Sequence, residues 1–214
     1  MKKSTEQFQY EVYDSIQELK QEDGWLLNEA REVAQQAYAP YSRFQVGAVA
    51  KLANGEIVAG ANQENASYPL GLCAERVLLA SASSLYPQVP IVSIAISYAN
   101  QIGESDHPVS PCGICRQSLL EFEKKMNQPI RLILGGLEGK VFIIPKAGLL
   151  LPLSFSAEEF KKFWVLNFQN DNSKLQTQNL VGRLYGQLSR KQANWYFCKL
   201  CAEQCIDEFV LCVY

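Results

Sequence analysis

The order of apolar and polar residues predicts alternating helices and strands between residues 24 and 144. Helical spacing of the apolar positions predicts helices near 24–38, 74–85 and 113–125, the first of them stopped before a proline. Short apolar or alternating runs predict strands near 45–52, 56–61, 91–97, 130–135 and 140–144. Helices that alternate with mostly apolar strands indicate an α/β sandwich, in which helices cover both faces of a sheet of about five strands.

Two further segments flank this region. Residues 1–23 form an N-terminal leader, and a short amphipathic helix is expected in it because the apolar positions recur at helical spacing at Phe8, Val12, Ile16 and Leu19. A last helix is expected after Ser156, where Ser-Ala-Glu-Glu has the form of a capping box. Residues 161–214 carry six Gln and five Asn in all, and they end in a segment rich in aromatic residues and cysteine. The expected division is therefore a leader (1–23), a main domain (24–160) and a C-terminal extension (161–214).

Composition and charge narrow the class of protein. The chain has 214 residues, of which 48% are hydrophobic and 20% are charged, as is usual for a globular protein. Twenty basic residues against 22 acidic ones give a net charge of −2, so the chain lacks the basic excess that favours nucleic acid. The N-terminus has no apolar signal segment, and no window reaches the roughly 18 uninterrupted apolar residues of a membrane span. We therefore expect a cytoplasmic protein with neither nucleic acid nor membrane as partner.

Three of the seven cysteines have a spacing that favours a metal. Cys73, Cys112 and Cys115 each lie at the predicted start of a helix, where the helix dipole lowers a thiol pKa and favours the thiolate that binds metals. The two-residue gap between Cys112 and Cys115 lets both sulfurs reach one ion, and Cys73 supplies a third ligand. Three protein ligands leave one position open, as in catalytic zinc sites. Glu75 follows two residues after the first ligand, a position suited to a general base.

The same residues carry a resemblance to a known family. Cys73-Ala74-Glu75 and Pro111-Cys112-Gly113-Ile114-Cys115 match the zinc deaminase signature H-x-E…P-C-x-x-C, with cysteine in place of histidine. Further matches are Tyr41-Ser42-Arg43-Phe44-Gln45-Val46-Gly47-Ala48, the stretch from Gly60 to Tyr68, and Arg116-Gln117. From about residue 24 to about 160 the chain resembles the small cytidine deaminases of pyrimidine salvage, of the all-cysteine, homotetrameric type. The resemblance implies a three-layer α/β/α sandwich with a mixed sheet, to which this chain adds its N-terminal helix and C-terminal extension.

The resemblance also implies a reaction. Cys73, Cys112 and Cys115 would hold one zinc ion per subunit, and Glu75 would shuttle protons during hydrolytic deamination of cytidine and deoxycytidine to uridine and deoxyuridine plus ammonia. Arg76 matches the arginine that hydrogen-bonds the ligand thiolates and reduces the negative charge that three thiolates place on the ion.

Substrate binding is implied for five positions. Asn62 and Glu64 match the pair that binds the ribose, Phe44 matches the aromatic ring that packs on the pyrimidine, and Ala74 belongs to the same site. Phe155 resembles a phenylalanine that closes the pocket of a neighbouring subunit. The nucleoside sites are therefore expected to be shared between the subunits of a homotetramer.

Several alternatives to this interpretation stay open. A related all-cysteine enzyme could deaminate a modified nucleoside or a nucleoside antibiotic, and a non-catalytic zinc-bearing interaction module would make Glu75 dispensable. Cys112 and Cys115 also have the spacing of a redox pair, although that leaves Cys73 and Glu75 unexplained. His107 is interpreted as an exposed loop residue rather than a fourth ligand. In the extension, heptad spacing indicates either a second metal site or an apolar helix face at Cys198, Cys201, Cys205 and Cys212.

Overall fold

The computed structural model describes residues 1–156, and Met1–Phe155 form one unit built on a single six-stranded sheet. The strands are β1 (Glu11–Tyr13), β2 (Phe44–Leu52), β3 (Ile57–Ala61), β4 (Ile91–Asn100), β5 (Arg131–Gly135) and β6 (Val141–Ile144). Their order across the sheet is β1-β6-β5-β4-β2-β3, and β4 and β5 run parallel while the other neighbours are antiparallel. The mixed sheet is thus confirmed, with one strand more than expected.

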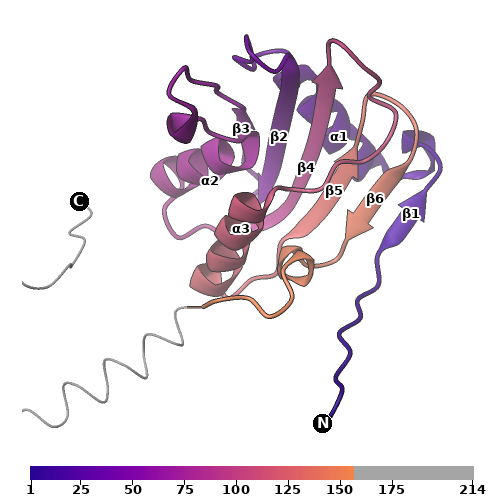
Figure 1. Ribbon diagram of the computed structural model, residues 1–214, viewed down its shortest axis with the longest axis vertical. Helices are drawn as coiled ribbons and strands as arrows, with labels where there is room; N and C mark the ends of the chain where they lie inside the picture. The colour runs from indigo at the N-terminus through magenta and orange to yellow at the C-terminus, as the bar shows by residue number, and fades with distance from the viewer. Residues whose placement is uncertain (157–214) are drawn as a thin grey trace, which may run out of the picture. The chain divides into compact units, whose positions relative to one another are not determined.

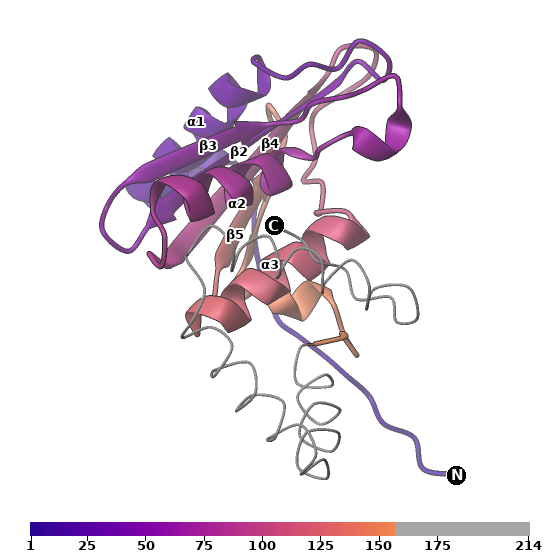
Figure 2. The same ribbon diagram turned by 90° about the vertical axis from the view of Figure 1, so that its left-hand side faces the viewer.

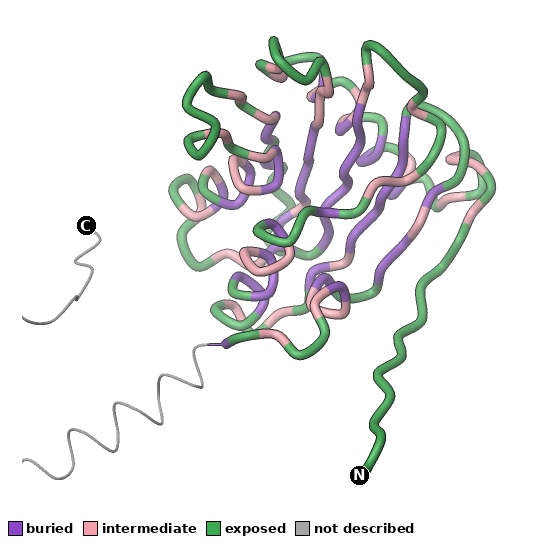
Figure 3. Tube along the Cα trace, in the orientation of Figure 1, coloured by how far each residue is buried: buried purple, intermediate pink, exposed green. Residues whose placement is uncertain are grey.

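Helices cover both faces of this sheet (Figures 1 and 2). The helices are α1 (Gln21–Ala34), α2 (Ala74–Leu85) and α3 (Gly113–Met126), with 3-10 turns η1 (Ile16–Glu18), η2 (Tyr68–Leu70) and η3 (Ala147–Leu150). On one face Leu26 and Leu27 of α1 pack with Ile133 of β5. On the other, Leu78 of α2 and Leu119 of α3 pack over the sheet in a second buried cluster. The two clusters confirm the three-layer α/β/α sandwich, and the buried trace in Figure 3 follows the central strands.

Two glycines let the helices lie directly on the strands. A Cβ atom at Gly60 of β3 would lie 2.5 Å from the backbone nitrogen of Leu78 and 2.6 Å from the carbonyl oxygen of Ala74, both in α2. On the opposite face, a Cβ atom at Gly47 of β2 would lie 2.2 Å from the carbonyl oxygen of Ala30 in α1. No side chain fits at either position, so the absence of a Cβ determines how closely α1 and α2 approach the sheet. The close contact of α2 with β3 therefore also determines where Glu75 lies, because Glu75 is in the first turn of α2.

The expected N-terminal helix is wrong. Residues 11–13 instead form the edge strand β1, which pairs antiparallel with β6 and places Val12 opposite Phe142. Tyr13, Ile16 and Leu19 pack against the cluster under α1. Of the positions that suggested one helical face, Phe8 precedes the strand, Val12 lies in it, and Ile16 and Leu19 lie in and just after the 3-10 turn η1. The open edge of β6 offers unpaired backbone groups, and pairing with them outweighs the local periodicity.

Two other boundaries differ from the expectation. Helix α1 begins at Gln21 and ends at Ala34 rather than near 38, because Tyr38 leaves the helix to exchange backbone hydrogen bonds with the segment 62–64. Strand β4 continues to Asn100 because β2 pairs with it as far as Phe44. No helix in residues 1–156 has the length and hydropathy that crossing a bilayer requires. The helix expected after Ser156, the extension 161–214 and its four cysteines lie outside the described residues.

Candidate active site

Three cysteines from two helices converge at one point. Cys73 is the N-cap of α2, Cys112 is the N-cap of α3, and Cys115 lies in the first turn of α3. The Sγ atoms of Cys73 and Cys112 are 3.8 Å apart, those of Cys112 and Cys115 are 3.4 Å apart, and all three lie within 4.8 Å of one another. Tetrahedral thiolates at the usual Zn–S distance of about 2.3 Å would be about 3.8 Å apart. The three sulfurs therefore fit a single zinc ion.

The surroundings of the cluster favour thiolate. Both cap residues present their sulfurs at helix N-termini, where unsatisfied N–H groups and the helix dipole place positive potential. A hydrogen bond from the Cys115 thiol, assisted by one from Cys112 and by the charge of Arg76, lowers the pKa of Cys73 to about 6. The same bond raises the pKa of Cys115, which is fully buried. One thiolate is thus available at neutral pH, and a cation that binds there would displace the remaining protons.

Glu75 is a buried carboxyl beside the cluster. Its residue is 5% exposed, in the first turn of α2, and it borders the same cavity as Cys73 and Cys112. Burial raises the pKa of the Glu75 carboxyl above its ordinary value. A carboxyl group with a raised pKa takes up a proton at higher pH than an exposed one, which suits a group that accepts and passes on protons.

The cluster opens into a cavity of about 1180 Å³. Its walls come from the start of β2, the end of β4, the segment 62–72 and the first residues of α2 and α3. Of the residues predicted for the site, those that line this cavity are Phe44, Asn62, Glu64, Cys73, Glu75, Arg76 and Cys112. Residues from four separate stretches of sequence therefore border one cavity.

Asn62 is held by the first residues of β2, and Glu64 is held by the residues just before that strand. The Asn62 side chain accepts the Val46 N–H at 2.7 Å and donates to the Phe44 carbonyl at 3.0 Å. Glu64 accepts a hydrogen bond from the Tyr41 N–H at 2.8 Å. The Ser42 side chain and the backbone N–H groups of Tyr41 and Ser42 all donate to the Glu64 carboxylate, and these hydrogen bonds lower its pKa. Glu64 is therefore an ionised, oriented acceptor at the rim of the cavity.

Two of the predicted substrate-binding residues do not line this cavity, and neither does the buried Cys115. Ala74 is fully buried at the start of α2, beneath Gly60 of β3. Phe155 is 57% exposed, and its carbonyl oxygen accepts a hydrogen bond of 3.2 Å from the Gln117 side chain of α3. Their roles in substrate binding stay predictions.

Two residues in or beside the site were given no role by the sequence, although Arg116 lies in a matched motif. Tyr98 of β4 lines the cavity, and its ring stacks on Phe44 with 4.9 Å between the ring centroids and 16° between the ring planes. Arg116 donates from Nε to the Pro111 carbonyl at 2.7 Å and from Nη1 to the Leu150 carbonyl at 3.1 Å, which ties the segment before Cys112 to η3. The alternation along β4, with Tyr98 two residues after the cavity residue Ile96, was the available signal for Tyr98.

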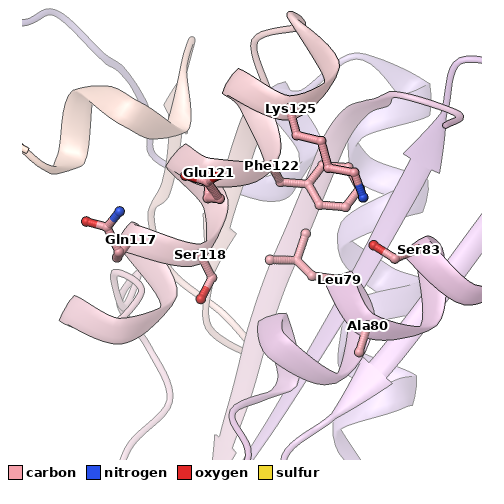
Figure 4. Close-up of a pocket in the computed structure, with 8 residues that line it drawn as sticks. All are labelled: Leu79, Ala80, Ser83, Gln117, Ser118, Glu121, Phe122 and Lys125. Atoms are coloured by element: carbon pink, nitrogen blue, oxygen red, sulfur yellow. The ribbon is translucent and has the colours of Figure 1, made fainter. Parts of the chain in front are cut away.

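A second hollow lies between α2 and α3 on their outer side (Figure 4). It measures about 460 Å³, and Lys125 extends over the Phe122 ring at 5.9 Å. The other lining residues are Leu79, Ala80, Ser83, Gln117, Ser118 and Glu121. This set contains no thiol or histidine, so the hollow has none of the metal-binding chemistry of the cavity at the cysteines.

Comparisons with known proteins identify the family of this chain. The family model of the cytidine and deoxycytidylate deaminase zinc-binding region matches residues 20–128, slightly more than half of the chain. A cytidine deaminase of Halalkalibacterium halodurans is 40% identical over 134 residues, 63% of this chain and 94% of that protein. One of Sporosarcina psychrophila is 36% identical over 134 residues, 63% of this chain and 91% of that protein.

A solved structure supports the same assignment. The crystal structure of cytidine deaminase from Burkholderia pseudomallei is 36% identical, with a TM-score of 0.55 over 64% of this chain and all of that one. The α/β/α fold, with a buried carboxyl beside three thiols that could hold a metal ion, defines an enzyme with a metal-binding cavity. The chain belongs to the cytidine and deoxycytidylate deaminase family. The suspected resemblance is therefore confirmed, and the protein is an enzyme of this type.

Proposed function

We propose that this protein catalyses the zinc-dependent hydrolytic deamination of cytidine and deoxycytidine to uridine and deoxyuridine with release of ammonia, a reaction of pyrimidine salvage. The observation that carries the proposal is the position of Glu75, a buried carboxyl that borders one cavity together with Cys73 and Cys112. An interaction module has no need of a buried carboxyl at this point, because burial of an unpaired charge is unfavourable. A deaminase needs a group there that moves protons.

The cysteines, Glu75 and Arg76 have different roles in this reaction. Cys73, Cys112 and Cys115 hold one zinc ion, which supplies a Lewis acid that lowers the pKa of water. Glu75 accepts a proton from the attacking water and passes it to N3 of the pyrimidine. It then accepts the proton of the new hydroxyl group on C4 and passes it to the amino group, which leaves as ammonia while the C4 carbonyl forms. Arg76 offsets part of the negative charge of the thiolates. In agreement with this role, its charge lowers the pKa of Cys73, although by less than the hydrogen bonds from the other two thiols do.

The remainder of the cavity suits a neutral nucleoside. Phe44 offers an aromatic face for the pyrimidine, and the ionised Glu64 accepts from a ribose hydroxyl beside the amide of Asn62. The protein has no basic excess for a phosphate backbone, with a net charge of −2. A nucleoside rather than a nucleic acid is thus the favoured substrate, and a compartment that keeps the three thiols reduced, such as the cytoplasm, is the favoured location.

Exposed apolar side chains at the rim support a shared site in a homotetramer. Tyr68 is 91% exposed and Ile114 is 63% exposed, although both border the cavity. Phe155, which is exposed outside its own cavity, would then close the cavity of a neighbour. A second subunit that covers this rim would remove apolar surface from water. The expected assembly is measurable by light scattering as a mass near four times 24.0 kDa.

The reaction is tested with zinc analysis and an absorbance assay. Wild type is expected to hold about one zinc per chain and to remove the absorbance band of cytidine. Glu75→Gln is expected to keep the zinc and lose at least about 100-fold in kcat, because its amide does not transfer protons. Glu121→Gln, an exposed carboxyl on α3, is the matched control and is expected to behave as wild type. A folded, zinc-loaded tetramer that deaminates neither cytidine nor deoxycytidine would refute the proposal.

A further inference from the structure

Tyr98 is the one aromatic residue of β4, and it lies behind the aromatic wall of the cavity. It is 3% exposed, and its ring covers one face of Phe44 in a nearly parallel stack, with 4.9 Å between centroids. Strand register places Tyr98 opposite Val46, so Phe44 is its diagonal neighbour on the same face of the sheet. Diagonal neighbours are within reach of aromatic side chains. The stack is therefore built into the pairing of β2 and β4.

The outer end of the Tyr98 ring is bounded by the loop between β4 and α3. The Tyr98 hydroxyl lies 3.4 Å from Nδ1 of His107, whose ring meets the Tyr98 ring edge-on at 5.9 Å. The same Nδ1 lies 2.9 Å from a carboxylate oxygen of Asp106. These contacts place a second side-chain layer behind Tyr98.

The loop itself is fixed to the turn between β5 and β6. A Cβ atom at Gly139 would lie 1.9 Å from the Asp106 carbonyl oxygen, and one at Gly136 would lie 2.1 Å from that of Ser105. The Ser105 carbonyl also accepts the Glu138 N–H at 3.3 Å. Backbone packed this closely does not leave room for the loop to move away, so Tyr98 is held from behind.

We propose that Tyr98 is a positioning residue for substrate binding, which acts by holding the Phe44 ring in the orientation that packs on the pyrimidine. The inference rests on the proposed function, in which Phe44 contacts the base. One face of Phe44 is occupied by Tyr98, and Phe44 lines the cavity beside Val46 and Asn62. An aromatic pair contributes enough beyond its buried area for its loss to weaken binding about 3- to 10-fold.

The test is a double-mutant cycle on binding. Tyr98→Leu keeps an apolar side chain and removes the stack, so we expect KM for cytidine to rise about 3- to 10-fold with kcat within twofold of wild type. In a Phe44→Ala background the same change is expected to alter KM by less than about twofold, because its target is gone. Tyr98→Phe retains the stack and is expected to restore KM to within about twofold of wild type.

Matched measurements separate this role from a structural one. Tyr86→Phe is the control for substitution of a tyrosine. It removes a hydroxyl that lies outside the cavity and donates a 3.0 Å hydrogen bond to Glu56. A merely structural Tyr98 would lower Tm and the active fraction in both backgrounds and leave KM unchanged. An unchanged KM in Tyr98→Leu, or an equal rise with and without Phe44, would overturn the inference.

The same cycle in a Glu75→Gln background reads cytidine Kd by calorimetry without turnover. Wild type that binds cytidine but does not deaminate it would refute the proposed function alone, and the cycle in Kd would still decide the role of Tyr98. Absence of any cytidine binding in wild type would overturn both proposals.

Discussion

The sulfur atoms of Cys73 and Cys112 lie 3.8 Å apart, although 39 residues separate them in the chain. Each is the N-cap of a helix on the same face of the sheet, and the two helices begin side by side over the end of the central strands. The fold thus brings two helix N-termini to one point, and the positive ends of both dipoles face the thiolates. A cation bound there would join α2 to α3 as well as serve the reaction.

This relationship predicts that metal removal loosens the fold. Treatment with a chelator is expected to lower Tm by several degrees and to abolish activity, and added zinc is expected to restore both, because an ion that binds the folded state stabilises it by linkage. Differential scanning fluorimetry with and without zinc measures the shift. Cys112→Ala supplies the control, since its Tm should be low at the outset and insensitive to the chelator. An unchanged wild-type Tm after complete metal removal would contradict this prediction.

The contact between Gly60 and α2 predicts a large effect of one methyl group. Gly60→Ala places a Cβ atom 2.5 Å from the Leu78 nitrogen, so α2 must move away from β3. We expect a loss of about 1–3 kcal/mol in the free energy of unfolding, and lower activity because Cys73 and Glu75 move with the helix. Gly24→Ala in α1, where the nearest atom is 3.8 Å away, is the matched control and should be neutral or slightly stabilising. Urea unfolding and the cytidine assay distinguish the two variants.

An ion pair of two hydrogen bonds fastens α1 to β5. Arg131 donates to both carboxylate oxygens of Asp23, at 2.6 and 2.8 Å, and the Asp23 side chain is only 10% exposed. Asp23→Ala leaves the partly buried guanidinium without this partner, and we expect it to lower the free energy of unfolding by about 2 kcal/mol. Glu22→Ala removes the exposed pair with Lys51 and should cost less than about 1 kcal/mol. Equal costs for the two variants would show that burial of the Asp23 pair contributes nothing.

The parts of the site that the sequence reveals are those encoded by short spacing. Cys112 and Cys115 lie one helical turn apart, and Glu75 follows Cys73 by two residues. Local helix geometry is therefore enough to predict that the members of each pair lie close together. Tyr98 needs the register of β2 against β4 before its contact with Phe44 can be seen. These last two residues are 54 positions apart, and although Phe44 lies in a matched motif, Tyr98 carries no signature of its own.

The same limit explains the error at the N-terminus. Residues 8–19 have helical periodicity, but the free edge of β6 exists only after the sheet has formed, and β1 pairs with it. The strands and helices from β2 to β6 were predictable because each buries an apolar face that its own sequence shows. The contacts of Asn62 with the backbone of β2 were not, because side-chain to backbone bonds of this kind leave no pattern in the sequence.

The hydrogen bonds of Glu64 predict a specific pH dependence of stability. Bonds from the Ser42 side chain and from the backbone of Tyr41 and Ser42 lower the pKa of the Glu64 carboxyl from its ordinary value of 4.5. Because the folded-state pKa is depressed, ionised Glu64 stabilises the fold fully above about pH 4.5. That contribution declines as pH falls below this value and is lost once pH passes the folded-state pKa. The Tm difference between wild type and Glu64→Gln should therefore be constant from pH 8 to 6 and shrink in acid. Ser42→Ala removes only one donor, so its Tm should differ from that of wild type by less than the Tm of Glu64→Gln does. A Tm difference that grows as pH falls would contradict the assigned role of these hydrogen bonds.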